Sequence, residues 1–220
     1  MEDEKTHCSD GDGCRRILEA AENLFADKGF DAASMNAIAA RAGISKANIY
    51  HYFPNKDALY LAVLRAASSN LRALLAEAVA SHGSVTEVLR HFAKAHLEAL
   101  LERPRLVRLV WREVLEKGAP RARELAEQGF AGVFSALVDI LVVGQERGEL
   151  RSDFDPALAA SLLIGANVFF FQARDILRHY PQVRFADDPA AYDDGLVDLL
   201  LRGLEAAHGG QANPAAGTGR

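Results

Sequence analysis

Residues 34–56 read SMNAIAARAGISKANIYHYFPNK, and this stretch decides the fold of the N-terminal part of the chain. It predicts two short helices, over residues 35–42 and 46–52, because a favourable N-cap residue precedes each of them. These caps are Ser34 and Ser45. A glycine between the two helices can supply the positive φ of a tight turn. Two helices joined in this way, the second only about seven residues long, indicate a helix-turn-helix.

The second short helix carries side chains suited to reading DNA. The small core expected beneath it consists of Ile38, Ala39, Ile44 and Ile49. The side chains left free to point outward are those of Lys46, Ala47, Asn48 and His51. Near a helix N-terminus such side chains fit the major groove, where Asn can bond an adenine edge and Lys can reach guanine. The helix N-terminus behind Ser45 also favours a phosphate.

The net charge of the whole chain argues mildly against a nucleic-acid partner. Lys and Arg number 25 against 30 Asp and Glu, which gives −5. However, residues 32–56 contain no Asp or Glu, whereas Arg41, Lys46, His51 and Lys56 all lie in this window. The predicted motif is therefore a locally basic patch in an acidic protein, as phosphate contact requires.

The rest of the chain predicts an all-α protein. Hydrophobic residues make up 50% of the sequence, and the alternation typical of strands is missing. About nine helices are expected, over residues 13–28, 35–42, 46–52, 56–81, 84–101, 105–117, 120–147, 155–179 and 189–207. No apolar stretch near the start could act as a signal peptide, so we expect a cytoplasmic protein. Residues 156–173 carry no charge, but a buried soluble helix is favoured there over a membrane span.

These observations predict four segments. They are a disordered extension over residues 1–12, a DNA-binding domain over 13–58, a C-terminal domain over 59–208 and a disordered tail over 209–220. No nucleophile–base set, metal-binding spacing or phosphate loop is present, so an enzyme, a metal site and a cofactor are not expected. Cys8, Cys14 and His7 cluster near the start, but their spacing matches no zinc pattern.

The block ILEAAENLFADKGFDAASMNAIAARAGISKANIYHYFPNKDALYLAVL, residues 17–64, resembles the N-terminal domain of TetR/AcrR-family transcriptional regulators. Several spaced features agree at once, among them Gly29-Phe30, the turn Ala42-Gly43-Ile44-Ser45 and the run Ile49-Tyr50-His51-Tyr52-Phe53. The resemblance implies a motif over residues 34–53. It also implies a helical C-terminal domain that binds a small effector and forms a dimer.

The same resemblance assigns roles to individual residues. It implies that Lys46, Ala47, Asn48 and His51 face bases or the nearby backbone. It implies that Tyr50 and Lys56 grip phosphates, helped by Ser34 and Ser45. Plain alternatives stay open at this point: Tyr50 and Tyr52 can be packing aromatics, His51 a solvated helix-end residue, Lys56 a surface lysine, and the two serines simple caps.

The last two predicted helices are apolar on more than one face, which favours a dimer. Residues 156–179 and 189–207 would form a four-helix bundle across a two-fold axis. The alternative is that the two helices cover each other within a monomer. A dimer also suits the DNA, because two recognition helices about 34–36 Å apart read half-sites one turn apart.

An effector cavity is expected in the C-terminal domain, because ligand sites are mostly apolar with a few polar groups. The candidate lining residues are His96, Trp111, Phe130, Phe134, Asn167 and Phe170, with His91 and Gln172 as further possibilities. For each aromatic, ordinary core packing is at least as plausible, and Asn167 can be a satisfied buried amide.

We therefore expect a ligand-responsive, homodimeric repressor that binds a palindromic operator in double-stranded DNA and is released by a small, hydrophobic effector. The alternative is an activator or a ligand-independent regulator that uses the same DNA-binding domain. A helical interaction module that has lost DNA binding is a further alternative, which the intact basic patch disfavours.

Overall fold

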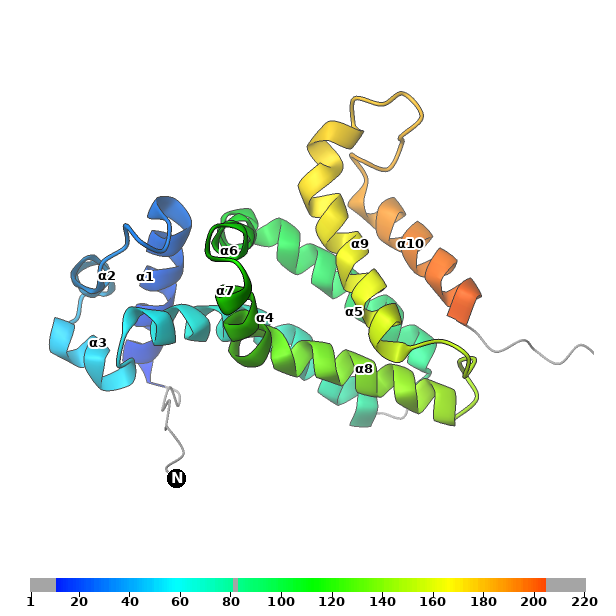
Figure 1. The fold of residues 1–220 in the computed structure, drawn as a ribbon, viewed down its shortest axis with the longest axis horizontal. Coiled ribbons are helices and arrows are strands. Elements are labelled where there is room, and N and C mark those ends of the chain that lie inside the picture. The colour runs from blue at the N-terminus through cyan, green and yellow to red at the C-terminus, as the bar shows by residue number, and fades with distance from the viewer. Residues whose placement is uncertain (1–10, 81–82, 205–220) are drawn as a thin grey trace, which may run out of the picture. The chain divides into compact units, whose positions relative to one another are not determined.

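The computed structural model describes residues 11–80 and 83–204, and that part of the chain is helical without a strand element (Figure 1). The helical elements in chain order are α1 (Asp12–Lys28), α2 (Met35–Ala42), α3 (Lys46–Tyr52), α4 (Lys56–Ala80), α5 (Val85–Glu102), α6 (Pro104–Lys117), α7 (Ala119–Glu124), η1 (Leu125–Phe130), α8 (Ala131–Glu146), α9 (Pro156–Leu177) and α10 (Pro189–Leu204). The all-α prediction is confirmed. The predicted tail and all but the last two residues of the predicted N-terminal extension lie outside the described residues.

The chain forms two compact units. The described residues up to 77, together with 95–136, make unit 1, and 78–94 with 137–204 make unit 2. Unit 1 therefore contains the predicted DNA-binding domain together with α6, α7 and η1. Unit 2 contains α9 and α10.

One apolar stripe of α1 anchors the core of unit 1. Its buried members, each at most 5% exposed, include Ile17, Ala20, Ala21, Leu24 and Phe25. The recurrence of apolar side chains every three or four residues made this face predictable. Phe25 meets Tyr60 of α4 edge to face, with ring centroids 5.5 Å apart. The contact fastens α4 to α1, the helix against which α2 packs.

The single helix predicted over residues 120–147 is wrong. The structure divides this segment into α7, a π-helical turn (η1) and α8. Gly129 and Gly132 lower the helix propensity there. Gly129 is also buried, so that a Cβ added to it would lie 3.7 Å from Leu125 and 3.8 Å from Leu64. A π-helical turn accommodates such a local break without ending the helical segment.

Unit 2 is held together by aromatic stacking and buried hydrogen bonds. Phe170 of α9 stacks on Tyr192 of α10 with centroids 4.1 Å apart, and the Tyr192 hydroxyl donates to the carbonyl of Ala166 at 2.6 Å. The amide of Asn167 is buried and donates to the carbonyl of Ala93 at 2.8 Å. These contacts join α9 to α10 and to the middle of α5.

One face of α9 lies in the core of unit 2, while the other is exposed. The exposed face carries Leu158, Leu162, Gly165, Phe169 and Ile176. By length and hydropathy alone α9 would also pass for a membrane span, and 33% of its most apolar 18 residues are buried. A core helix of a soluble protein passes the same test, so this finding is weak support for a membrane span.

Candidate nucleic-acid interface

The predicted helix-turn-helix forms with its predicted caps. The hydroxyl of Ser34 accepts a hydrogen bond from the N–H of Ala37, and that of Ser45 accepts from the N–H of Asn48, both at 3.2 Å. Each cap satisfies one of the free N–H groups that begin a helix. Gly43 adopts the left-handed conformation, with φ 65° and ψ 38°, and turns the chain between α2 and α3.

Arg16 of α1 holds this turn from the side. Its guanidinium donates to the carbonyl oxygens of Ala42 and Gly43, the latter at 3.2 Å. These carbonyls end α2 and have no partner within the helix. The turn needs glycine for its positive φ, and a Cβ added to Gly43 would lie 2.6 Å from an Arg16 nitrogen and so displace the guanidinium.

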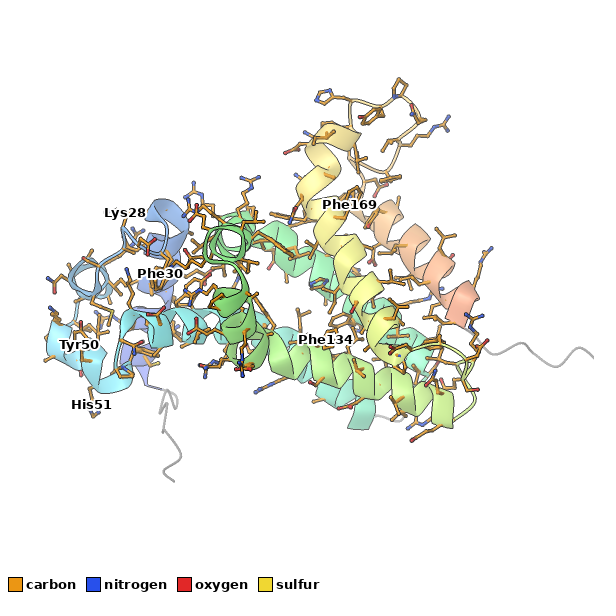
Figure 2. All side chains as sticks on the ribbon, in the orientation of Figure 1. Lys28, Phe30, Tyr50, His51, Phe134 and Phe169 are labelled. Atoms are coloured by element: carbon orange, nitrogen blue, oxygen red, sulfur yellow. The ribbon has the colours of Figure 1, made fainter. Side chains whose placement is uncertain are left out.

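α3 buries one residue fully and leaves most of its others in solvent. Ile49 is 0% exposed and packs into the core of unit 1, against which the half-buried Tyr52 also lies. The exposed residues of α3 are Lys46, Ala47, Asn48, Tyr50 and His51, and Figure 2 shows Tyr50 and His51 at the edge of this unit. The residues that the sequence marked as base-facing thus share one exposed helix.

The electrostatics of α3 suit a polyanion. Among the residues that the structure describes, Lys46 makes no ion pair, and its ammonium lies 5.8 Å from the centre of the Tyr50 ring. The only ion pair of the 32–56 window within that part of the chain joins Arg41 to Asp27, at the 4.0 Å limit. The exposed Lys46 is therefore available for a phosphate contact.

Lys56 has contacts that its predicted role did not include. Its ammonium donates to the carbonyl oxygens of Phe30, at 2.9 Å, and Asp31, at 3.2 Å. It also lies 4.4 Å from the centre of the Phe30 ring, as a cation–π contact. Lys56 therefore fastens the turn after α1 to the start of α4, and its contact with phosphate stays a prediction.

Two family models match the chain. Residues 17–63 match "Bacterial regulatory proteins, tetR family", and residues 86–193 match "Tetracyclin repressor-like, C-terminal domain". The chain belongs to the TetR family. The members and relatives found are transcriptional regulators rather than enzymes, in agreement with the capped, basic helix-turn-helix described above.

Individual members of the TetR family align with most of the chain. The regulator RutR of Escherichia coli K12 is 32% identical over 145 residues, which cover 64% of this chain and 66% of RutR. FadR of Bacillus halodurans, a fatty acid degradation regulator, has the same fold, with 22% identity, TM-score 0.71 and coverage of 87% and 99%. A Thermus thermophilus FadR, a repressor solved with lauroyl-CoA, is 26% identical with TM-score 0.59 and coverage of 93% and 99%.

The predicted effector residues are distributed over both units of this TetR-family protein. His96, Trp111, Phe130 and Phe134 belong to unit 1, and Asn167 and Phe170 to unit 2. His96 is buried, and burial lowers the pKa of its imidazole to about 4. Trp111, Phe130 and Phe134 are each about 40% exposed. Asn167 and Phe170 already have partners within unit 2, which gives both a structural role.

A groove of about 430 Å³ lies on unit 1, between α1 and α6. It is lined by Ala26, Asp27, Arg105, Arg108, Leu109 and Arg112. None of the predicted effector residues lines this groove. Its three arginines make it a polar surface, unlike the apolar pocket expected for a hydrophobic effector.

The described residues contain no group of three potential metal ligands. Cys14 is buried in α1, whereas His7 and Cys8 lie outside the described residues.

Sequence reasoning missed an ionic cluster that lies in unit 1 together with the helix-turn-helix. We call it the Arg121 cluster; it consists of Phe30, Lys56, Asp57, Tyr60, Glu113, Lys117, Arg121 and Glu124. All its members belong to unit 1. The contacts join residues up to 91 positions apart in the sequence, and nothing in the local pattern around Arg121 marks it as buried.

Proposed function

We propose that the chain is a homodimeric transcriptional repressor that binds a palindromic operator through α3. The exposed side chains of α3, held on the buried Ile49 within a window free of acidic residues, carry this proposal. Lys46 and Asn48 lie at the N-terminal end of α3, where recognition helices contact bases. Ser34, Ser45, Tyr50, His51 and Lys56 are the proposed backbone contacts.

The exposed face of α9 supports the proposed homodimer. Its apolar side chains are spaced four or seven residues apart and include Phe169, which is 60% exposed, and Ile176, which is 62% exposed. At Gly165, in the middle of the stripe, a Cβ would meet nothing within 4 Å, so a second helix could approach closely there. α10 adds Leu199, which is 76% exposed, between Gly195 and Gly203. An apolar face of this kind suits an isologous interface.

The proposed effector is a small molecule with a long apolar part. The Thermus thermophilus relative was solved with lauroyl-CoA and the Bacillus subtilis FadR with stearoyl-CoA, so acyl-CoA thioesters are the first probes. His96, Trp111, Phe130 and Phe134 are the proposed contacts in unit 1. Effector binding would favour a conformation in which the spacing of the two α3 helices of the dimer no longer matches the operator. The higher affinity of the effector for this conformation would release the DNA. As a regulator that binds DNA, the protein would act in the cytoplasm.

Selection from random double-stranded DNA tests the repressor proposal. We expect an enriched palindrome with half-sites about one helical turn apart. A mobility-shift assay with that DNA, titrated with lauroyl-CoA and with free coenzyme A as the control, then tests the effector class. Binding without enrichment of any sequence would contradict the operator. A reporter gene whose expression rises on binding would identify the activator alternative.

A further inference from the structure

Arg121 joins α7 to two other helices through its two terminal nitrogens. Nη2 lies 3.2 Å from a carboxylate oxygen of Glu113 on α6, and Nη1 lies 3.3 Å from one of Asp57 on α4. Nη1 also contacts Glu124 on its own helix. The Arg121 side chain is 4% exposed and that of Glu113 is 2% exposed. A planar guanidinium can hold two partners in fixed directions, which a lysine cannot.

Aromatic rings fix the direction from which Arg121 approaches. Its guanidinium carbon lies 4.6 Å from the centre of the Tyr60 ring and 4.8 Å from that of Phe30. Phe30 also receives the ammonium groups of Lys117 at 4.3 Å and Lys56 at 4.4 Å. Three cations around one ring are tolerated because carboxylates balance them, as Glu113 does for Lys117 at 2.9 Å.

Such a cluster contributes more to geometry than to stability. A buried ion pair roughly offsets its own desolvation, so apolar side chains of similar volume often stabilise a fold at least as well. By contrast, charged groups with several fixed partners admit few alternative arrangements. The orientation of α4 relative to α6 and α7 is therefore the property that Arg121 specifies.

The contact with α4 lies close to the recognition helix. Asp57 is the second residue of α4, and only Phe53, Pro54 and Asn55 separate α4 from α3. Phe53 is 0% exposed and its N–H donates to the carbonyl of Ile49 at 2.8 Å. The link from Arg121 to Asp57 therefore meets α4 four residues after the buried Phe53, which ends α3. A shift of the first turn of α4 can be passed to α3 through this short connection.

We propose that Arg121 is a positioning residue that, through Asp57, sets the direction of α3 and thereby the half-site spacing that the dimer accepts. The inference rests on the proposed function. The link to Asp57 is the part of the cluster most open to solvent, since the Asp57 side chain is 53% exposed. It can therefore be cut without leaving the buried Glu113 unpaired.

Asp57→Asn and Glu124→Gln are the matched pair of variants. Each removes one carboxylate from the same Arg121 nitrogen without changing side-chain size. Only Asp57→Asn cuts the link to α4, because Glu124 lies on the helix of Arg121 itself. Affinities are measured for the selected operator and for the same operator with one extra central base pair. The ratio of the two affinities is insensitive to the general effect of losing a negative charge, because both DNAs carry nearly the same charge.

We expect the wild type and Glu124→Gln to prefer the selected spacing by about tenfold or more. For Asp57→Asn the preference should fall to about threefold or less, and Asp57→Glu should restore part of it. Thermal unfolding should differ little among the variants, because the buried pair with Glu113 stays intact. An unchanged ratio for Asp57→Asn, or an equal fall for Glu124→Gln, would overturn the proposal.

Hydrogen exchange separates this inference from the proposed function. Asp57→Asn should speed exchange of the amides in residues 46–60, whereas Glu124→Gln should not. If random DNA yields no operator, the proposed function fails, and this measurement still tests the link. Equal exchange in all three proteins would overturn the link itself.

Discussion

The guanidinium of Arg16 donates to the carbonyl oxygen of Gly43 at 3.2 Å, so the first helix of the protein holds the turn of the helix-turn-helix. The same group reaches the carbonyl of Ala42, at the end of α2. The turn is thereby fixed by a residue outside the motif. Operator binding should depend on Arg16 even without a contact between Arg16 and DNA.

Arg16→Ala should lower the free energy of unfolding by about 1.5–3 kcal/mol, since hydrogen bonds to a charged group contribute about that much. Operator affinity should also fall, because the turn that orients α3 loosens. Urea unfolding measures the first effect. Arg15→Ala is the control: within residues 11–80 and 83–204 the only ion pair of Arg15 is with the exposed Asp12, so its loss should cost under about 0.5 kcal/mol. Equal losses for the two variants would refute the role of Arg16.

Gly43→Ala should destabilise the protein by about 1–2 kcal/mol through its left-handed φ alone, and further by displacing Arg16. Gly148→Ala is the matched control, because Gly148 has a φ of 71° with nothing within 4 Å of an added Cβ. In an Arg16→Ala background the cost of Gly43→Ala should fall toward that of Gly148→Ala. A double-mutant cycle measures this coupling, and additive costs would show that the contact is unimportant.

Lys46→Ala and Asn48→Ala should weaken DNA binding in different ways. Loss of a phosphate contact weakens all sequences alike and reduces the salt slope by about one per contact, whereas loss of a base contact relaxes preference at one position by about 1–3 kcal/mol. For Asn48→Ala we expect the second pattern. For Lys46→Ala we expect a lower affinity together with a smaller salt slope. Repeating the selection with each variant distinguishes them. An unchanged base preference in Asn48→Ala would remove Asn48 from the reading residues.

Phe169→Asp should convert the proposed dimer into a monomer, because it places a charge on the apolar stripe of α9 (Figure 2). Analytical ultracentrifugation over a concentration series measures the result. Leu115→Asp is the control, since Leu115 of α6 is 81% exposed and lies outside the stripe. A Phe169→Asp protein that stays dimeric would place the interface elsewhere.

His96 should make the protein less stable in mild acid. Burial lowers the pKa of His96 from 6.5 to about 4, so the unfolded chain binds a proton in a range where the folded protein does not. The free energy of unfolding therefore decreases as the pH falls from about 6.5 to 4, by about 2 kcal/mol between pH 7 and 5. Unfolding experiments at both pH values should show a smaller decrease for His96→Gln. His91→Gln, at an exposed position of α5, should behave as wild type.

The local signals in the sequence predicted the motif well. Ser34, Gly43 and Ser45 act within three residues of their own positions, so their roles follow from backbone geometry alone. Arg16 and Arg121 could not be predicted in this way. The partners of Arg16 are backbone carbonyls 26 and 27 residues away, which any residue type would offer, and Asp57 is 64 residues from Arg121.

Two further features could not be predicted from local signals. Lys56 suits a phosphate by residue type, yet its ammonium meets the Phe30 ring and two carbonyls of the turn after α1. The helix over 120–147 was predicted as continuous, but a π-helical turn that contains the buried Gly129 interrupts it. The contacts of Lys56 depend on residues distant in sequence, and its phosphate contact stays a prediction.

The sparse packing of α3 bears on how such a regulator can diversify. Ile49 alone is fully buried, so folding places little restriction on positions 46, 47, 48, 50 and 51. Substitutions at these positions can alter the DNA sequence that is read while the thermal stability of the scaffold stays nearly constant. After gene duplication, a copy could therefore acquire a new target site by a few surface changes, without compensating mutations in the core.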